Sequence, residues 1–321
     1  MRTAFARALT DLAGRDRRIT LITGDLGFGV MEGFARSYPG QFLNIGVAEQ
    51  NMTSVAAGMA LSGRIVFTYS IGNFPTLRCV EQIRNDVCYH RADVKVVTVG
   101  GGFAYGTLGI SHHATEDMAI MRALPNMVVV APGDPIETAA AVLAVAARAG
   151  PCYLRLGRAG ERNVHGDGVA FELGRAIMLR DGGDVTLIST GGMLERAMRA
   201  AERLDAEGVR ARVLSMHTVK PLDADAVVRA ARETGGIVTI EEHSVIGGLG
   251  SAVADALVDS GVPGVRFRRV ALPAGFAAVV GSQDYLRDAY GLSEDAVVAV
   301  VRQVVESRSR EMSAWDGRSD S

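Results

Sequence analysis

Short apolar strands alternate with helices along this chain, and the alternation occurs twice. Runs of β-branched and apolar residues end in Gly, Asp or Pro, and segments with helical periodicity separate them. The predicted strands are residues 19–23, 65–69, 95–99 and 127–131 in the first half and 185–189, 209–214 and 237–240 in the second. Such alternation is typical of a largely parallel sheet covered by helices on both faces. The sequence therefore predicts the α/β class, with two α/β domains.

The boundary between the two domains is predicted in a segment rich in Gly and His, at residues 162–174, which has little apolar periodicity. A length of 321 residues also suits two domains, each with a full core. We expect the first domain to span residues 1–165 and the second 166–307. Residues 308–321 are expected to form a disordered, solvated tail, because Ser, Arg and Asp surround its single Trp.

Composition excludes several classes of protein. The net charge is −2 and arginines are scattered rather than clustered, which is atypical of proteins that bind nucleic acid or anionic membranes. No run of about 18 apolar residues occurs, so no membrane span is predicted. The three cysteines have no metal-binding spacing, and their odd number indicates reduced thiols in a cytoplasmic protein.

Glu49 stands at the start of an otherwise apolar helix predicted from about residue 48 to 61. Small and apolar residues occupy every face of this helix, which indicates that it is buried all round. Glu49 has a structural interpretation, as a first-turn acid that free N–H groups and the helix dipole stabilise. It also has a functional one, as a buried carboxyl group with a raised pKa that binds a ligand atom. The pattern alone favours the structural interpretation.

The segment Gly46-Val47-Ala48-Glu49-Gln50-Asn51, followed by Ala56-Ala57-Gly58, resembles the signature of the pyrimidine-binding domain in transketolase and 1-deoxyxylulose-5-phosphate synthase. These enzymes use thiamine diphosphate. The resemblance extends over nearly the whole chain, and residues 219–223 and 241–250 resemble segments at turns and domain contacts of the transketolase C-terminal domain. It implies that Glu49 is both catalytic and cofactor-binding, sharing a proton with N1′ of the aminopyrimidine ring. A carboxylic acid kept in a dry site suits that task.

The resemblance continues through the segment Tyr69-Ser70-Ile71-Gly72-Asn73-Phe74, whose last residue takes the place of a phenylalanine that stacks on the cofactor pyrimidine. Offset stacking on an aromatic face contributes roughly 0.5–1.5 kcal/mol. Ile71 replaces another phenylalanine of the family pattern and would form one wall of the pocket. Asp25, in a glycine-rich loop after a predicted strand, is a further candidate for cofactor binding, although a tight turn explains that loop nearly as well.

Candidate substrate-binding residues lie in and after a loop predicted at residues 100–113. His112 takes the place of a family histidine that contacts oxygen atoms of the substrate and the intermediate, which implies a catalytic as well as a substrate-binding role. A neutral imidazole can donate to or accept from a hydroxyl group there. His113 replaces the glutamine that follows in the family. Arg158 matches an arginine that binds sugar phosphate, for which its fork of donors is suited.

Besides Ile71 and His113, three further positions depart from the family pattern. Leu108 occupies the place of an aspartate that reads a hydroxyl group of the donor. Gly29 and Gly100 occupy the places of a serine and a histidine that help to hold phosphate. Several of the residues with which transketolase binds a sugar phosphate are therefore missing. Leu108 is still expected to line the substrate site.

The sequence offers no metal ligands for the diphosphate end of the cofactor. Gly166-Asp167-Gly168 resembles the start of the diphosphate motif, but it lies in the interdomain linker and no Asn follows at the family spacing, so a flexible turn is the better interpretation. The resemblance therefore implies a separate N-terminal subunit that binds Mg²⁺ and diphosphate. It implies a shared thiamine diphosphate and an α2β2 complex.

The predicted function is that of the C-terminal subunit of a split transketolase-like transferase, which passes a two-carbon ketol or acyl unit to an aldehyde or ketone. Two alternatives stay open. One is a decarboxylative carboligase or a dehydrogenase β subunit acting on a 2-oxo acid, which Leu108 makes credible. The other is a scaffold subunit that keeps the fold without the cofactor, against which Glu49 and Phe74 argue.

Overall fold

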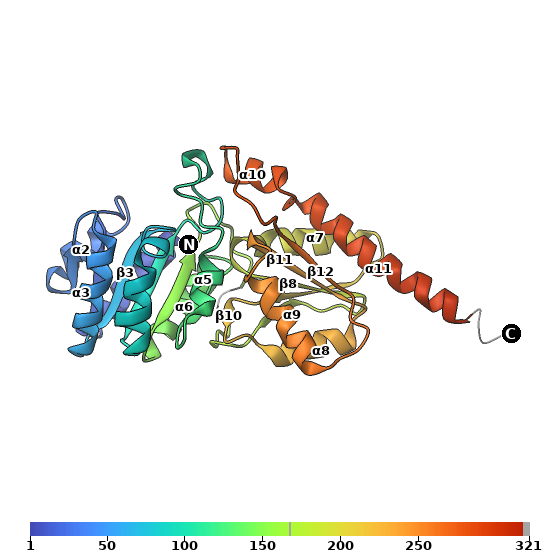
Figure 1. The fold of residues 1–321 in the computed structure, drawn as a ribbon, viewed down its shortest axis with the longest axis horizontal. Coiled ribbons are helices and arrows are strands. Elements are labelled where there is room, and N and C mark those ends of the chain that lie inside the picture. The colour runs from blue at the N-terminus through green and yellow to red at the C-terminus, as the bar shows by residue number, and fades with distance from the viewer. Residues whose placement is uncertain (167, 317–321) are drawn as a thin grey trace.

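The computed structural model describes residues 1–166 and 168–316, with side chains as far as Glu306. It shows two α/β domains side by side (Figure 1). The prediction of two domains with mostly parallel sheets is confirmed. Asp167 of the predicted linker turn and residues 317–321 of the predicted tail lie outside the described residues, while the last helix extends to Asp316.

The first domain is built on a seven-stranded sheet with the order β10-β5-β6-β4-β3-β1-β2, in which all pairs are parallel except β10 with β5. Its strands are β1 (Ile19–Thr23), β2 (Phe42–Asn44), β3 (Ile65–Ile71), β4 (Val94–Val99), β5 (Val128–Val130), β6 (Cys152–Leu156) and β10 (Thr218–Lys220). The central strands β3, β4 and β6 are buried along their whole length, as parallel strands covered on both faces must be.

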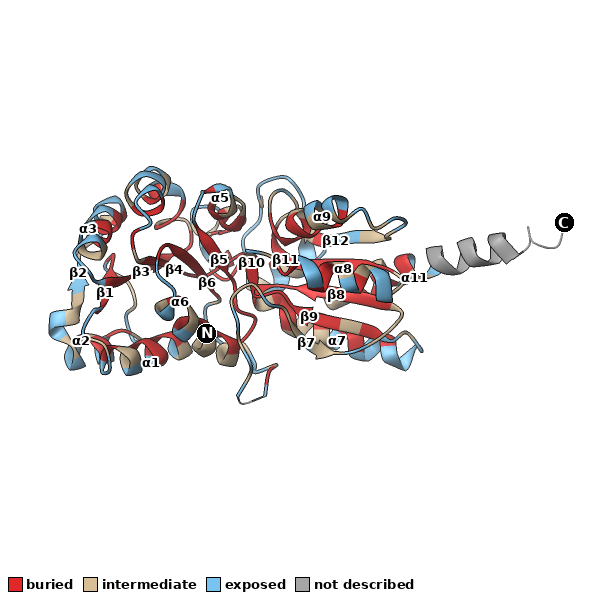
Figure 2. Cartoon of the chain, turned by 90° about the horizontal axis from the view of Figure 1, so that it is seen from below, coloured by how far each residue is buried: buried red, intermediate tan, exposed pale blue. Residues whose placement is uncertain are grey.

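Helices cover both faces of this sheet (Figure 2). The helices of the first domain are α1 (Arg2–Ala13), α2 (Glu32–Ser37), α3 (Glu49–Leu61), α4 (Val80–Gln82), α5 (Asp117–Ala123) and α6 (Pro135–Ala147). Helices α1 and α6 pack on one face, while α3 and α5 lie on the other (Figure 2). The segment between β3 and β4 is built from a 3₁₀ turn over Leu77–Cys79, α4 and a π-helix over Ile83–Tyr89.

The second domain has a five-stranded sheet with the order β12-β11-β8-β9-β7, in which only β7 runs antiparallel to its neighbour. Its strands are β7 (Ile177–Arg180), β8 (Val185–Ser189), β9 (Ala211–Ser215), β11 (Ile237–Ser244) and β12 (Phe267–Leu272). Its helices are α7 (Leu194–Ala206), α8 (Ala224–Glu233), α9 (Leu249–Ser260), α10 (Gln283–Ala289) and α11 (Glu294–Asp316). Helices α7 and α11 cover one face, and α8 and α9 the other (Figure 1).

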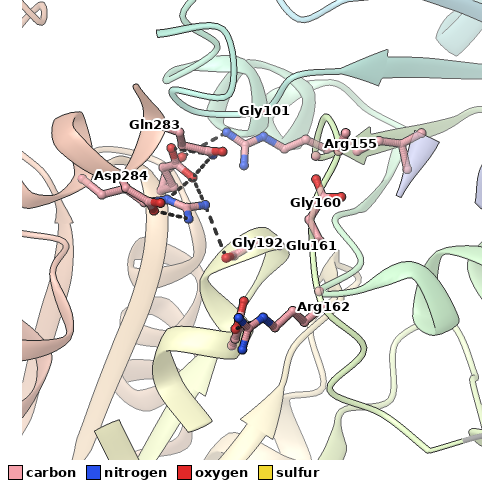
Figure 3. A pocket seen from close by; sticks show the side chains of 16 residues that line it. Gly101, Arg155, Gly160, Glu161, Arg162, Gly192, Gln283 and Asp284 are labelled. Atoms are coloured by element: carbon pink, nitrogen blue, oxygen red, sulfur yellow. Dashed lines mark hydrogen bonds and ion pairs between the residues drawn. The ribbon is translucent and has the colours of Figure 1, made fainter. Parts of the chain in front are cut away.

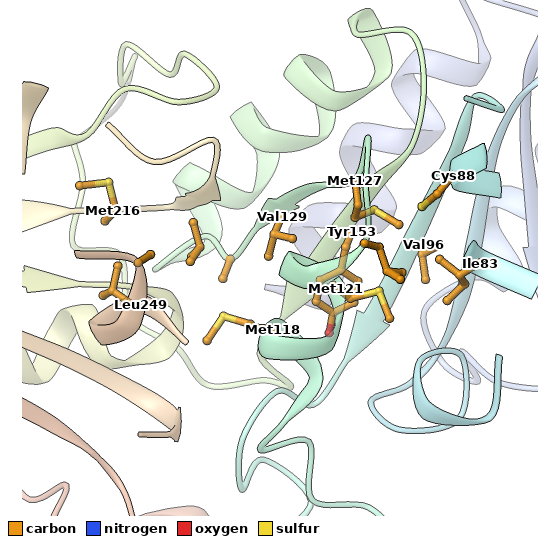
Figure 4. Close-up of a cluster of buried hydrophobic side chains, with 14 of the residues drawn as sticks. Ile83, Cys88, Val96, Met118, Met121, Met127, Val129, Tyr153, Met216 and Leu249 are labelled. Atoms are coloured by element: carbon orange, nitrogen blue, oxygen red, sulfur yellow. The ribbon is translucent and has the colours of Figure 1, made fainter. Parts of the chain in front are cut away.

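One of the buried apolar clusters spans both domains. Strand β10 leaves the second domain and pairs with β5 at the edge of the first sheet. Side chains from both domains form one buried cluster across the junction (Figure 4), including Met118, Met121, Met127, Val129, Met216 and Leu249. His243 of β11 is buried and accepts a hydrogen bond from the Ala119 N–H at 3.3 Å. The segments 219–223 and 241–250, predicted at turns and domain contacts, therefore do lie at the junction.

The linker between the domains is held by buried polar groups. Asp134 caps the N-terminus of α6, as its position before Pro135 predicts, by accepting from the Glu137 N–H at 2.7 Å. The other carboxylate oxygen of Asp134 accepts from the backbone N–H groups of Val164 and His165, each at 2.7 Å. A single aspartate thus fixes both the helix and the start of the linker.

Candidate active site

Glu49 is the first residue of α3 and is only 1% exposed. One oxygen of its carboxylate accepts a hydrogen bond from the Arg78 guanidinium at 2.7 Å, and the other accepts from the Ser70 hydroxyl at 3.4 Å. The Arg78 side chain is 48% exposed, so the cation reaches the buried acid from the surface. The residue before the helix, Ala48, has no side-chain cap, which leaves the N–H groups of the first turn to favour an acid here.

An aromatic wall stands beside Glu49. The Arg78 guanidinium carbon lies 5.1 Å from the centre of the Phe74 ring, so one cation contacts both Phe74 and Glu49. The His112 ring meets the Phe74 ring edge to face, with centroids 5.1 Å apart. Ile71, the last residue of β3, is buried in the apolar cluster against which Phe74 packs. The structure therefore brings four of the predicted site residues together: Glu49, Ile71, Phe74 and His112.

Asp25 lies where the carboxyl ends of β1 and β2 meet. Its backbone N–H donates to the Asn44 amide oxygen at 2.9 Å, and the Asn44 amide donates back to the Asp25 carboxylate at 3.1 Å. The same Asn44 oxygen accepts from the Gly46 N–H at 3.1 Å, three residues before Glu49. A Cβ atom at Gly24 would lie 3.4 Å from the Glu49 side chain. Asp25 and Asn44 together hold the backbone that presents Glu49.

Tyr105 fills space that the family histidine would need. A Cβ atom at Gly100, whose φ is +92°, would come within 2.2 Å of the Tyr105 ring. The Arg158 guanidinium carbon lies 4.8 Å from the centre of that ring, and the His112 ring lies 6.3 Å from it. The absence of a side chain at Gly100 therefore makes room for Tyr105, which links Arg158 to His112. Burial raises the pKa of the Tyr105 hydroxyl, so Tyr105 stays protonated.

The two neighbouring histidines of the loop differ in environment. His112 is half-buried, and burial and then the nearby His113 lower its pKa, which favours the neutral imidazole. The His113 side chain is buried at 1% exposure, against Phe103 and within 3.3 Å of the Gly106 carbonyl oxygen. This burial argues against the predicted direct contact of His113 with substrate and fits support of the loop instead. Leu108 is exposed at the loop tip.

A buried network of ion pairs and hydrogen bonds ties the loop to the second domain, and Figure 3 shows the part of it that lies around Arg155 and Gln283. The Arg155 guanidinium donates to the Asp117 carboxylate at 2.7 Å, to the Ala114 carbonyl oxygen at 2.7 Å and to the Glu242 carbonyl oxygen at 3.0 Å. The Glu242 carboxylate in turn accepts from the Phe103 N–H at 2.8 Å and from Arg287 at 2.7 Å. The loop that carries His112 is therefore anchored at both ends.

Several of these residues were not predicted from the sequence. Arg78 and Asn44 carry no motif, and only the fold brings them to Glu49. Tyr105 is one aromatic in a glycine-rich loop. Arg155 gives a signal, because a charged residue inside the apolar run 152–156 requires a buried partner.

Two family models match the chain: the transketolase pyrimidine-binding domain over residues 1–162, and the transketolase C-terminal domain over residues 174–297. The chain belongs to the transketolase family. It is 39% identical, over 96% of its length and 95% of the relative, to the 6-deoxy-6-sulfo-D-fructose transketolase subunit SqwH of a Clostridium species. It is 37% identical, over 95% of its length and 97% of the relative, to one of the apulose-4-phosphate transketolase subunits of Phocaeicola vulgatus.

A solved structure described as a split-gene transketolase, inactive β4 tetramer, matches with a TM-score of 0.86 and 40% identity, over 94% of this chain and 97% of that one. Single-chain relatives are about twice as long. The chain is 37% identical to 1-deoxy-D-xylulose-5-phosphate synthase of Heliobacterium modesticaldum over 95% of its own length but only 47% of the synthase. The protein is thus the C-terminal subunit of a split transketolase, a transferase.

The pyrimidine-binding domain implies thiamine diphosphate as the cofactor. Among the residues that the structure describes, no group of three or more His, Cys, Asp or Glu side chains is placed to hold a metal ion. No helix in the described part of the chain is long and apolar enough to cross a membrane.

Proposed function

We propose that this transketolase subunit supplies the pyrimidine side of the cofactor site, with Glu49 as the acid that holds a proton at N1′ and Phe74 as the stacking face. One observation carries the proposal: the Arg78 guanidinium, a flat group with N–H donors, takes both contacts at once, on Glu49 and on Phe74. A flat heterocycle with a nitrogen atom fits the same two partners. The Phe74 N–H donates to the Ile71 carbonyl oxygen at 2.9 Å, so Ile71, at the end of β3, lies beside the proposed stacking face.

Each side chain has a distinct task when the cofactor is bound. When bound, thiamine diphosphate would supply the nucleophilic carbon that transfer of a two-carbon unit requires. Glu49, in its dry position, holds the proton that N1′ shares. His112, kept neutral by its lowered pKa, donates to or accepts from a substrate hydroxyl group at the mouth of the site. Asp25 acts through Asn44, holding the turn before α3 in place.

A separate N-terminal subunit would bind Mg²⁺ and the diphosphate. The relatives in Clostridium and Phocaeicola are themselves named as subunits. An exposed apolar surface also lies beside the site, formed by two loops that meet where the Gly281 N–H donates to the Gly106 carbonyl oxygen at 3.3 Å. Its side chains are Leu108, Ile110, Phe276 and Val280. A partner subunit that binds against these two loops to complete the cofactor site would cover this apolar surface.

We propose an α2β2 complex of two copies of each chain in the cytoplasm. The structure of the split-gene relative is described as an inactive β4 tetramer, which supports self-association of the C-terminal subunit without activity when the partner is missing. The isolated 321-residue chain should therefore neither bind thiamine diphosphate tightly nor turn over.

The donor is proposed to be a ketose with an anionic end, which gives up a two-carbon ketol unit to an aldehyde. Arg158, exposed and stacked on Tyr105, offers a fixed fork of donors for that anion. The relatives named for sulfofructose and for apulose 4-phosphate act on sugars with a sulfonate or a phosphate group.

A 2-oxo acid is the second candidate donor, because Leu108 provides no hydrogen-bond acceptor at the loop tip. An unpaired hydroxyl group against Leu108 would cost roughly 1–3 kcal/mol. The similarity to 1-deoxy-D-xylulose-5-phosphate synthase also favours this alternative. Product analysis with ketose phosphates and with pyruvate would separate the two donor classes.

Calorimetry with and without the partner subunit tests the proposal. Thiamine diphosphate with Mg²⁺ should bind to the mixture and leave the isolated chain unbound, and turnover should follow the same pattern. Tight Mg²⁺-dependent binding by the isolated chain would refute the division of the site between two subunits. An assembled complex that binds no cofactor would instead indicate a scaffold subunit.

A further inference from the structure

Arg78 lies where the cofactor ring has to be. Its Nη1 donates to the Glu49 carboxylate at 2.7 Å, and its guanidinium carbon lies 5.1 Å from the centre of the Phe74 ring. These are the two groups that we assign to the aminopyrimidine ring, one as hydrogen-bond partner and one as stacking face. Two flat groups cannot occupy both contacts at the same time.

The contact with Arg78 also satisfies the buried acid. Glu49 is 1% exposed, and an ionised carboxylate without a partner is costly at such a position. The other titratable neighbour, Cys79, cannot pair with Glu49, because a thiol ionises only to an anion, and burial raises its pKa to about 11. Arg78 is therefore the one cation that pairs with Glu49 among the described residues.

Arg78 is held loosely enough to leave. It belongs to a short 3₁₀ turn over Leu77–Cys79, and nearly half of its side chain is exposed. In the described part of the chain, its side chain makes no hydrogen bond other than the one to Glu49. The long side chain can swing into solvent without breaking any further hydrogen bond that the structure shows.

We propose that Arg78 is a positioning residue that acts as a placeholder for the aminopyrimidine ring. It pairs with Glu49 and covers Phe74 in the empty subunit, and it swings out when the cofactor binds. This inference rests on the proposed roles of Glu49 and Phe74. Because the closed form must open first, the apparent cofactor affinity is lower than the intrinsic affinity by the open fraction.

The test is cofactor binding by the complex assembled with the partner subunit and Mg²⁺, measured by calorimetry. Two probes are compared: thiamine diphosphate, and an analogue in which carbon replaces the pyrimidine nitrogen that faces Glu49. Arg78→Ala should tighten both by the same factor, about tenfold for a charge-assisted contact half open to water. Arg78→Gln keeps a donor for Glu49, so the tightening should be smaller.

The matched control is Arg84→Ala, which removes an exposed arginine bonded to its neighbour Asn85, and its affinities should equal those of the wild type. Weaker or unchanged binding in folded Arg78→Ala and Arg78→Gln complexes would overturn the inference and, where weaker, make Arg78 a cofactor ligand. Glu49→Gln tests the proposed function separately, because it should weaken the binding of thiamine diphosphate relative to that of the carbon analogue. If Glu49→Gln changes the affinities for the two probes by the same factor, the assignment of Glu49 fails, whatever Arg78 does.

Discussion

Two carboxylate–arginine pairs in the first domain have the same 2.7 Å contact and very different surroundings. In the pair of Asp117 with Arg155 both side chains are buried, and the guanidinium also donates to two backbone carbonyl oxygens. In the pair of Glu49 with Arg78 the acid is buried, but the arginine is 48% exposed and makes this single hydrogen bond among the described residues.

The difference separates a structural pair from a functional one. Arg155 has a fixed place in the fold, because removing it would leave the buried Asp117 carboxylate without its cation. Among the described residues, the Arg78 side chain makes a single hydrogen bond, to Glu49, so another group that satisfies Glu49 can replace it. A buried acid whose partner is exposed and replaceable is therefore a better candidate for a ligand site than one whose partner is locked.

The largest expected effect is on the structural pair. Arg155→Ala should lower the free energy of unfolding by about 3–5 kcal/mol, because it leaves the Asp117 charge unpaired in the core. Urea denaturation of the isolated chain measures this loss. Arg155→Lys keeps the charge but loses the fork, so its loss should be smaller. A loss in Arg155→Ala no greater than that in Arg78→Ala would remove the distinction between the two pairs.

The neighbouring histidines give the next comparison. His112→Asn should lower kcat/KM of the assembled enzyme about a hundredfold, because it removes an acid–base partner at the mouth of the site. The stability of that variant should be close to that of the wild type. His113→Asn should show the reverse, with a loss of about 1–2 kcal/mol in the free energy of unfolding for a buried polar group. Equal losses of kcat/KM in the two variants would indicate that His113 contacts the substrate as His112 does.

His217, a buried histidine at the domain junction, should make the stability of the protein depend on pH. Its ring is buried and stacks on Phe171 with centroids 3.9 Å apart, and burial lowers its pKa to about 3. The unfolded chain takes up a proton near pH 6.5, whereas the folded chain does so only near pH 3. Above pH 6.5 the buried neutral ring of His217 costs no stability. Below pH 6.5 the free energy of unfolding falls by about 1.4 kcal/mol for each pH unit, because the unfolded chain binds a proton that the folded chain does not.

His217→Phe should flatten the fall of the unfolding free energy between about pH 6.5 and pH 5, as chemical denaturation at each pH would show. His90→Asn, which changes an exposed histidine, should leave the slope as it is in the wild type. An unchanged slope in His217→Phe would mean that His217 is protonated in the folded protein.

The smallest effect on stability is expected at the loop tip. Leu108→Asp should change the free energy of unfolding by less than about 0.5 kcal/mol, because the side chain is exposed. It should shift the ratio of kcat/KM values toward donors with a hydroxyl group at the position that transketolase reads. In the wild type, a deoxy-ketose or a 2-oxo acid should compete well as donor with a ketose that carries this hydroxyl group. A clear preference of the wild type for xylulose 5-phosphate in a broad panel would contradict this interpretation of Leu108.

Most of the fold could be predicted from the sequence, because buried parallel strands are continuous apolar runs. The segment 237–240 predicted β11, and 65–69 predicted β3. β6 was missed because Arg155 interrupts its apolar run, and β10 because three residues are too short to show a pattern. The pairing of β10 with β5 depends on contacts between domains, which no local pattern encodes.

The candidate site could be predicted only in part. Glu49 and Phe74 lie in recognisable segments, so the sequence alone singles them out, and their roles stay predictions. Arg78 and Tyr105 were missed because their roles depend on side chains that are distant in sequence and that only the fold brings next to them. The predicted linker boundary at residue 165 and the roles of Arg158 and Asp25 stay predictions.

The central claim is that Glu49 holds the proton through which the cofactor is activated. The most direct measurement is the rate of hydrogen–deuterium exchange at thiazolium C2 in the assembled complex, followed by NMR. Glu49→Gln keeps the size of the side chain but cannot share the proton, so the account predicts a folded complex in which C2 exchange is lost. A Glu49→Gln complex that exchanges C2 hydrogen at the wild-type rate would contradict it.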